Sequence, residues 1–248
     1  MMSRIFVTGD KHGYYETLAQ QLKDANTTTN DVVIILGDHG TLYYGSQNDE
    51  FKKTRANRLP ATLIMLRGNH DRRPTAEGYQ HKKVTLNTPA YAGTFYIDES
   101  YPNILYTTEY GWYRFGTKHV YVICGAYSVD KYKRLYMQQH GFTSYHWFTD
   151  EQLSPDEQLQ VQSEIMKHPM ETFDIMSHTV PLTYKPTDCL LTGIDQSTVD
   201  QSTEEWLDVL EHQVQYRNWY CGHWHINRSV YKVRFLYEDL ILYDEVEE

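Results

Sequence analysis

Short apolar runs separated by polar, glycine-containing loops dominate the first part of the chain. Three of these runs, residues 4–8, 31–36 and 61–66, are rich in β-branched residues and show little alternation, which is typical of parallel strands buried on both faces. Between them, residues 14–25 carry apolar side chains at helical spacing, and residues 48–59 form a mostly polar helical segment. This alternation of strands and helices predicts a layered α/β fold.

The middle of the chain has short, tyrosine-rich segments in which apolar and polar residues often alternate. This pattern predicts antiparallel strands, which we expect to form a second sheet. The predicted strands are residues 90–97, 104–106, 110–115 and 120–124. Gly116-Thr117-Lys118 fits the turn of a hairpin between the last two.

A polar and aromatic insertion without clear periodicity covers about residues 128–153. A long aromatic segment of this kind is either a lid or pocket wall or a surface excursion with its own small aromatic cluster, and the sequence favours neither. After it, the pattern predicts helices at residues 154–167 and 203–213, with a loop at 186–203. The remaining predicted strands are residues 172–176, 219–221, 230–235 and 240–243.

Composition narrows the class of protein. Of the 248 residues, 40% are hydrophobic, enough for a sizeable core. The net charge of −10 is spread along the chain, which disfavours a nucleic-acid polymer as ligand but allows an anionic substrate beside metal ions. None of the three cysteines lies in a CxxC pair, so neither a zinc knuckle nor a disulfide framework is indicated. Without a signal peptide or an apolar run of ~18 residues, we expect a cytoplasmic protein that does not enter the membrane.

Candidate chemistry is concentrated in five short motifs, each directly after a predicted strand. They are Asp10-Lys11-His12-Gly13, Gly37-Asp38, Gly68-Asn69-His70-Asp71, Ser177-His178 and Gly222-His223-Trp224-His225. Strand ends project side chains into the loop layer, where sites are built. Their carboxylate, amide and imidazole groups suit a pair of catalytic divalent metals better than a structural zinc. A site that draws on nearly the whole chain predicts a single domain, residues 1–248.

The order Asp-x-His, Gly-Asp, Gly-Asn-His-Asp, His, Gly-His-x-His resembles that of the calcineurin-like metallophosphoesterases, in particular small bacterial and phage members. The resemblance covers nearly the whole chain. It implies a four-layer αββα sandwich, in which two mixed β-sheets are flanked by helices and the metal site lies at the carboxyl ends of the strands. It also implies two divalent metal ions, with manganese as the first candidate and iron, zinc, nickel or cobalt as alternatives.

The resemblance assigns a role to each motif residue. The residues that would hold the first metal are Asp10, His12, Asp38 and His225. Those that would hold the second are Asp38, Asn69, His178 and His223. Asp38 would bridge the two metals together with a water or hydroxide that attacks phosphorus in line, and His70 would protonate the leaving oxygen as general acid.

The second motif departs from that of the Ser/Thr protein phosphatases of the same superfamily. Their Gly-Asp-x-x-Asp-Arg-Gly is replaced by Gly37-Asp38-His39-Gly40-Thr41-Leu42-Tyr43, which lacks the Asp that orients the catalytic histidine and the Arg that grips phosphate. Arg72 and Arg73 are candidates to replace that grip, and His39 is a further candidate substrate contact. For all three, an ordinary loop position is the alternative.

These features predict a metal-dependent phosphoric ester hydrolase acting on a small or nucleotide-like phosphoester. Phosphatase and phosphodiesterase activities both stay open. A phosphoprotein phosphatase is an alternative that the second motif disfavours, and a DNA nuclease is disfavoured by the net charge. An alternative of another class is a non-catalytic binding scaffold with the same fold, which should show gaps at ligand positions, whereas this chain has none. The sequence does not determine the oligomeric state.

Overall fold

The computed structural model describes residues 2–45, 47–168, 172–189 and 197–247. Its strands are β1 (Met2–Thr8), β2 (Val32–Ile35), β3 (Thr62–Met65), β4 (Lys82–Asn87), β5 (Tyr91–Ile97), β6 (Ile104–Thr107), β7 (Tyr110–Phe115), β8 (Lys118–Ile123), β9 (Phe173–Ser177), β10 (Tyr216–Cys221), β11 (Arg228–Val230), β12 (Val233–Phe235) and β13 (Ile241–Glu247). Its helices are α1 (Glu16–Asp24), α2 (Gln47–Asn57), α3 (Lys131–Gln139), α4 (Pro155–Ile165) and α5 (Ser202–Glu211), with short 3₁₀ turns at η1 (Leu182–Tyr184) and η2 (Thr187–Cys189).

Hydrogen bonding connects these strands in one mixed sheet. The order is β11-β12-β10-β9-β8-β7-β5-β6-β3-β2-β1-β13, and β4 pairs with β5 outside this path. β1, β2, β3 and β6 run parallel to one another, and so do β8, β9 and β10. The predicted parallel strands and the hairpin between β7 and β8 are therefore confirmed.

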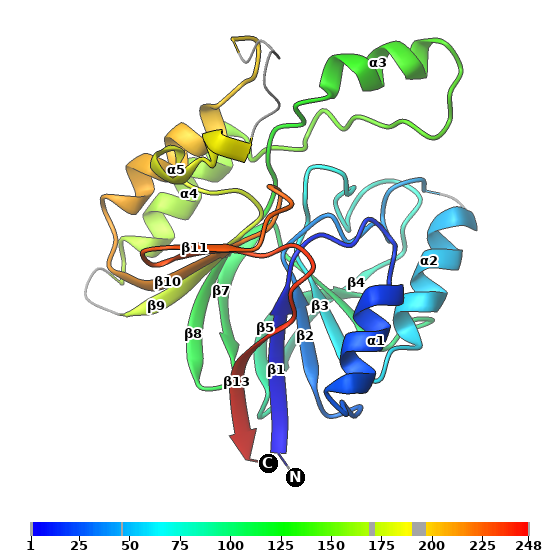
Figure 1. Cartoon of the computed structure of the whole chain (residues 1–248), viewed down its shortest axis with the longest axis vertical. Helices are drawn as coiled ribbons and strands as arrows, with labels where there is room; N and C mark the ends of the chain where they lie inside the picture. Colours follow the sequence, from blue (N-terminus) through cyan, green and yellow to red (C-terminus); the bar gives the residue numbers. More distant parts are fainter. Residues whose placement is uncertain (1, 46, 169–171, 190–196, 248) are drawn as a thin grey trace.

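The α/β class with flanking helices is confirmed, whereas the finer prediction of two separate sheets in a four-layer sandwich is not. The two halves of the sheet are joined where β5 pairs with β7, through Tyr91 opposite Phe115 and Ala92 opposite Arg114. Two residue pairs are a narrow connection, so the halves turn toward each other while remaining one hydrogen-bonded sheet. Figure 1 shows α1 and α2 on one side of the strands and α4 and α5 on the other.

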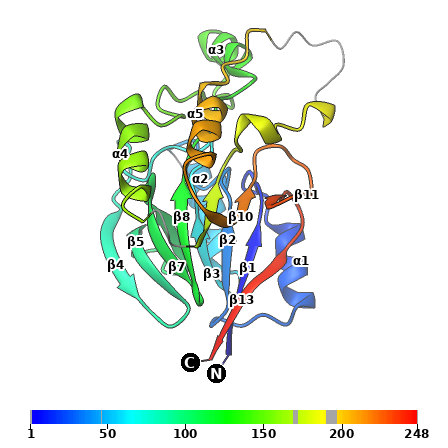
Figure 2. The ribbon, with the colours of Figure 1, turned by 90° about the vertical axis from the view of Figure 1, so that its left-hand side faces the viewer.

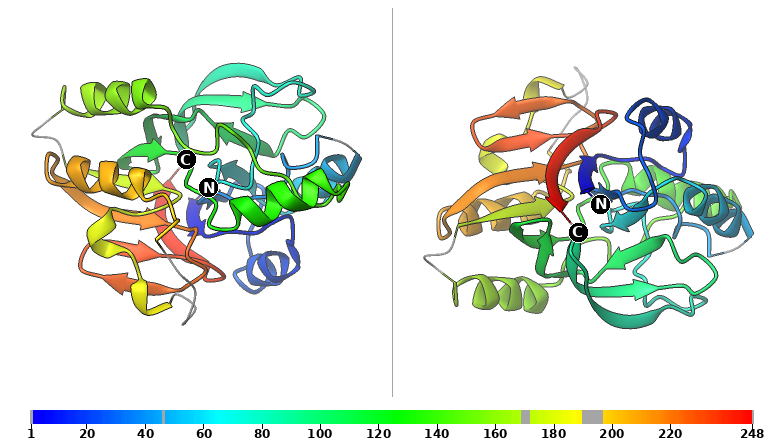
Figure 3. Two further views of the ribbon diagram at one scale, coloured as in Figure 1. Left: turned by 90° about the horizontal axis from the view of Figure 1, so that it is seen from above. Right: turned by 90° about the horizontal axis from the view of Figure 1, so that it is seen from below.

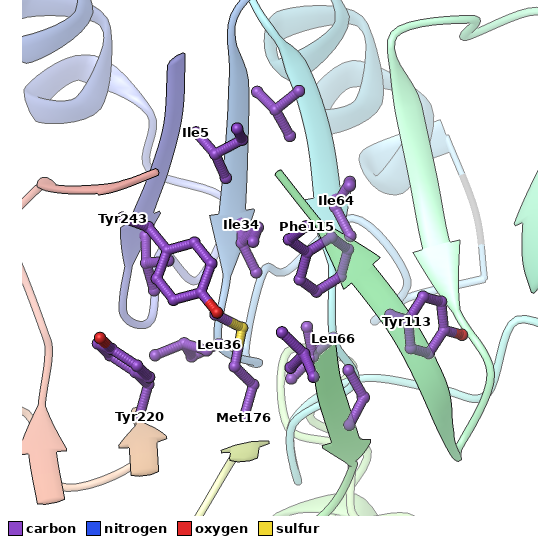
Figure 4. Packing of buried hydrophobic residues seen from close by; sticks show 14 of the residues in the cluster. Ile5, Ile34, Leu36, Ile64, Leu66, Tyr113, Phe115, Met176, Tyr220 and Tyr243 are labelled. Atoms are coloured by element: carbon purple, nitrogen blue, oxygen red, sulfur yellow. The ribbon is translucent and has the colours of Figure 1, made fainter. Parts of the chain in front are cut away.

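The main hydrophobic core lies between the two halves of the sheet. Ile34 on β2 and Ile64 on β3 belong to one buried cluster with Phe115 on β7 and Met176 on β9 (Figure 4). The outer faces of the two halves pack on helices. On one of them, Leu18 of α1 belongs to a second cluster together with buried residues of β1, β2 and β3. A third cluster joins α4 and α5 to β8, β9 and β10. Each fully buried aliphatic or aromatic side chain contributes roughly 1.5–3 kcal/mol, so the unbroken apolar runs of the sequence stabilise these layers.

Three local features differ from the predictions. β4 was not predicted because its side chains are mostly exposed, so it lacks an apolar signal. The predicted strand 230–235 is instead the hairpin β11–β12, whose turn residue Tyr231 has a left-handed φ of 51°. The insertion contains α3, which has no buried residue and therefore no helical stripe of apolar positions. Of the predicted loop 186–203, residues 190–196 lie outside the described residues.

The carboxyl ends of β1, β2, β3, β9 and β10 gather at one end of the molecule. Both termini lie at the opposite end, because β1 and β13 pair antiparallel with Met2 opposite Glu247 (Figure 2). Seen from above in Figure 3, α3 and the chain that leads to and from it extend over the strand ends. The fold thus brings the five motifs and the insertion to the same end.

Candidate active site

The five motifs meet at the strand ends, each directly after its own strand. Asp10, Asp38 and Asn69 follow the parallel strands β1, β2 and β3, and His178 and His223 follow the parallel strands β9 and β10. Two groups of potential ligand atoms result, and within each group all atoms lie within 4.8 Å of one another. The first group is Asp10, His12 and His225, and the second is Asp10, Asp38 and His178.

The first group is held together around Asp10. Its Oδ2 atom lies 3.1 Å from Nε2 of His225 and 4.0 Å from Nε2 of His12. The two imidazole nitrogens are themselves 3.0 Å apart. Three potential ligand atoms from the loops after β1 and β10 therefore lie close together.

The second group is extended by the Asn69 amide. Asn69 Oδ1 lies 2.9 Å from Nε2 of His178 and 3.0 Å from Nδ1 of His223. Asp38 lies between the groups, with Oδ1 3.5 Å from Nε2 of His178 and Oδ2 3.9 Å from Nδ1 of His12. The structure thus brings all seven predicted metal ligands together.

The backbone at these positions has an uncommon conformation. Four of the predicted ligands have left-handed φ values, 48° at His12, 46° at Asp38, 66° at His223 and 50° at His225. Each such residue costs roughly 1–2 kcal/mol, and conformations of this kind are concentrated at functional sites. Surrounding hydrogen bonds hold them: the Asp38 carbonyl accepts the N–H of His12 at 2.7 Å, and Asp10 Oδ1 accepts the N–H of His223 at 2.9 Å.

Two motif glycines make room for ligand carboxylates. A Cβ on Gly68 would lie 2.1 Å from Oδ1 of Asp38, and a Cβ on Gly222 would lie 2.2 Å from Oδ1 of Asp10. Both distances are far shorter than a real carbon–oxygen contact. The glycine of one motif therefore packs against the carboxylate of another, which explains why these positions need a residue without a side chain.

The donor set fits divalent metal ions. Asp10 and Asp38 are only 3% and 2% exposed, and Oδ2 of Asp10, although buried, has ion-pair contacts to His225 and His12 but no well-aligned hydrogen bond among the described residues. Two carboxylates buried this deeply are costly unless cations compensate them. His178 Nδ1 contacts the carbonyl oxygen of Leu36 at 2.7 Å, which leaves Nε2 turned toward Asp38. This is the usual arrangement of a metal-binding histidine.

The charges of the site point the same way. Burial lowers the pKa of the His178 imidazole, but Asp38, Asp10 and the carbonyl of Leu36 together outweigh burial, and the net pKa is raised to about 9. Burial and the charge of His178 together lower the pKa of His223 to about 3. In the absence of metal, a proton on His178 thus compensates the buried carboxylates, and metal binding would displace it.

A cleft of about 650 Å³ opens beside His12, His70 and His225. Its other walls carry four tyrosines and two cations, namely Tyr14, Tyr43, Tyr44, Tyr145, Lys52 and Arg134. A larger cavity of about 850 Å³ lies near α5 and β10, but no motif residue lines it. The cleft beside the histidines is therefore the place where substrate can reach the predicted ligands.

The insertion forms one wall of this cleft, which supports the pocket-wall alternative over a surface excursion. Arg134 on α3 donates from Nη1 to the Tyr43 hydroxyl at 2.8 Å and approaches Nε2 of His70 to 3.2 Å with Nη2. The sequence placed Arg134 in the insertion, for which a pocket wall was one of two alternatives, and assigned it no contact of its own. The only local signal is Asp130 four positions earlier, which pairs with Nε of Arg134 at 2.7 Å.

The three predicted substrate contacts do not line the cleft. Arg73 is engaged by Glu157 at 2.5 Å and Asp150 at 3.0 Å. Arg72 donates to the Tyr43 carbonyl at 3.1 Å. His39 is 1% exposed and contacts Thr41 at 2.8 Å. In this structure, the cations of the cleft are instead Lys52 and Arg134.

An α/β sheet that carries carboxylate, imidazole and amide donors at its strand ends defines a candidate metal-dependent hydrolase. The chain belongs to the calcineurin-like phosphoesterase family, whose model matches residues 3–227. This confirms the resemblance and indicates metal-dependent phosphoester hydrolysis. No curated protein matches the chain significantly. Every helix in the part of the chain that the structure describes is too short or too polar to cross a membrane.

Proposed function

We propose that the protein is a dinuclear metal-dependent phosphoester hydrolase. The observation that carries the proposal is the convergence of two ligand groups that share Asp10, the second of which contains Asp38, at the ends of four strands, with Asn69 at the end of a fifth. Asp10, His12, Asp38 and His225 would hold one ion. Asp38, Asn69, His178 and His223 would hold the other. When bound, the ions supply Lewis acidity that activates water and neutralises phosphoryl charge.

Asp38 is suited to serve both ions. Its two oxygens face different histidines, Oδ1 toward His178 and Oδ2 toward His12. Oδ1 also accepts the backbone N–H of His70 at 2.8 Å, which fixes the carboxylate orientation and ties it to the loop that carries His70. A displacement of Asp38 would therefore disturb both ligand groups and the position of His70.

His70 is proposed as the general acid. Its side chain lines the cleft, and its ring centroid lies 5.8 Å from that of His12. Arg134 Nη2 lies 3.2 Å from Nε2 of His70, and because a guanidinium only donates hydrogen bonds, Nε2 is the acceptor in this contact. A phosphoryl group in the cleft would accept from Arg134 and leave Nε2 free, and its negative charge would favour protonation of His70. His70 could then donate a proton to the leaving oxygen.

The substrate we propose is a small or nucleotide-like phosphoester, with manganese as the first metal to test and a cytoplasmic, single-domain protein as the setting. The tyrosines and the two cations of the cleft support an organic phosphoester. Monoester and diester substrates are both compatible with this cleft, and the experiment below compares one of each.

The test compares para-nitrophenyl phosphate with bis-para-nitrophenyl phosphate in the presence of Mn²⁺. We expect metal-dependent turnover that falls by roughly 10²–10⁴-fold in His70→Ala with metal content retained, and a loss of both metal and turnover in Asp38→Ala. His119→Ala, an exposed histidine on β8, is the matched control and should keep native rates. Native rates in His70→Ala and Asp38→Ala, or metal-independent turnover, would overturn the proposal.

A further inference from the structure

Ser128 and Glu151 stand at the two ends of the insertion and meet at the metal ligand Asn69. We propose that this pair is a positioning device that fixes which face of the Asn69 amide, oxygen or nitrogen, is presented to the metal. The inference rests on the proposed function, because it takes Asn69 as a ligand. It adds a role for two residues of the insertion that lie outside the ligand set.

The contacts form a continuous chain of hydrogen bonds. Asn69 Nδ2 donates to Ser128 Oγ at 2.9 Å, and Ser128 Oγ donates to Glu151 Oε2 at 2.5 Å. The backbone N–H of Ser128 donates to the other oxygen, Oε1, at 3.0 Å. All three residues are at most 2% exposed, so water does not compete for these groups.

The chemistry of the three groups gives this chain a direction. Burial raises the pKa of the Glu151 carboxyl, whereas the hydrogen bonds from the Ser128 hydroxyl and N–H lower it. In its ionised form this carboxylate only accepts hydrogen bonds, so the single hydrogen of the Ser128 hydroxyl is committed to Glu151. The remaining Ser128 lone pairs can only accept, and the part of Asn69 that faces them must be the N–H₂ group. Asn69 Oδ1 is thereby turned the other way, to 2.9 Å from His178 Nε2 and 3.0 Å from His223 Nδ1.

The opposite amide orientation would place N–H donors where a metal needs a lone pair. Asparagine alone has little preference between the two, since its oxygen and nitrogen ends are nearly equal in size. The pair therefore preorganises the oxygen before any metal arrives, as partners of ligating groups commonly do.

Glu151 is itself anchored. Its backbone carbonyl accepts from Nη1 of Arg67 at 2.9 Å and from the N–H of Ala126 at 3.2 Å. Arg67 is in turn paired with Glu109 at 2.6 Å. The two ends of the insertion, at Ser128 and Glu151, are thus fixed to the loop after β3. The segment between them contains Arg134 and forms the cleft wall.

The test measures Mn²⁺ binding to the metal-free full-length protein by isothermal titration calorimetry, independent of turnover. Ser128→Ala removes the acceptor, and Glu151→Gln supplies an N–H₂ group that can reverse the direction of the chain. For both variants we expect a 10–100-fold loss of affinity at one of the two Mn²⁺ sites. Ser128→Thr keeps the hydroxyl and should bind within about threefold of native. Ser100→Ala is the matched control for the Ser→Ala change, because Ser100 is exposed in the connection between β5 and β6.

The outcomes separate this inference from the proposed function. Native protein that binds no Mn²⁺, or only one equivalent, refutes the dinuclear site itself. Native protein that binds two equivalents, with Ser128→Ala and Glu151→Gln binding both equally well, overturns the positioning role alone. Circular dichroism of the metal-free variants checks folding. If Ser128→Ala is misfolded, the comparison of Glu151→Gln with Ser128→Thr decides, and equal affinities in these two variants overturn the inference.

Discussion

Replacing Arg134 with methionine tests how the insertion takes part in catalysis. The guanidinium has three nitrogens, and two are already used by the protein. Nε pairs with Asp130 at 2.7 Å, and Nη1 donates to Tyr43 at 2.8 Å and to the His146 carbonyl at 3.2 Å. Only Nη2 faces the cleft, where it lies 3.2 Å from His70. One nitrogen is therefore available for a phosphoryl oxygen.

The expected magnitude follows from this count. Loss of one preorganised donor to transition-state charge lowers kcat by about 10²–10³-fold, equivalent to roughly 2.7–4 kcal/mol. Methionine keeps much of the apolar stem of arginine, so the loss of packing is small. Arg134→Lys keeps the charge, but its ammonium group cannot contact Asp130, Tyr43 and a phosphoryl group at once. Its kcat should therefore lie between those of native protein and Arg134→Met.

The assay measures kcat and KM separately for the preferred nitrophenyl ester at saturating Mn²⁺. We expect the change in Arg134→Met to appear in kcat more than in KM, because the contact strengthens as phosphoryl charge develops. Lys133→Met removes one positive charge from the exposed face of the same helix and should leave kcat near native. A kcat for Arg134→Met within threefold of native, or an equal loss in Lys133→Met, would refute the reasoning.

Two further predictions concern the fold around the site. The side-chain hydrogen bond from Arg73 lowers the pKa of Glu157 from 4.5 to about 2, so this pair stabilises the fold above the unfolded-state pKa and loses that effect as the pH falls from about 4.5 toward about 2. In urea titrations, the difference in unfolding free energy between native protein and Arg73→Met should be full at neutral pH and shrink over that range, and a constant difference would contradict it. Gly68→Ala would force a Cβ to 2.1 Å from Asp38 Oδ1 and should abolish Mn²⁺ binding. Its control is Gly78→Ala, whose Cβ meets nothing within 4 Å but whose φ is +94°, and which should cost only about 1–2 kcal/mol of backbone strain and keep metal affinity. Equal Mn²⁺ affinities of the two variants in calorimetry would show that the Gly68 contact is relieved without moving the ligand.

The sequence by itself predicted those strands, helices and candidate ligands whose signal is local. The apolar runs before Asp10, Asp38 and Asn69 predicted buried parallel strands, because side chains buried on both faces leave no polar alternation. A helix was predicted from residue 154 onward, and the structure begins it there with a reciprocal capping box between Ser154 and Glu157. The motif order predicted which residues would meet, and the seven candidate ligands do lie together.

Only the tertiary structure decided which charged residues reach the cleft and what orients the ligands. Arg134 meets His70 across 64 positions of sequence, and Ser128 meets Asn69 across 59. No local pattern assigns either residue its partner, although both lie in the insertion for which a pocket wall was one of the alternatives. Arg73 has a promising place beside its motif, yet Glu157, 84 positions away, engages it. The physical reason is the same in each case: apolar periodicity and capping act within a few residues, whereas the partner of a polar side chain is set by the packing of distant segments.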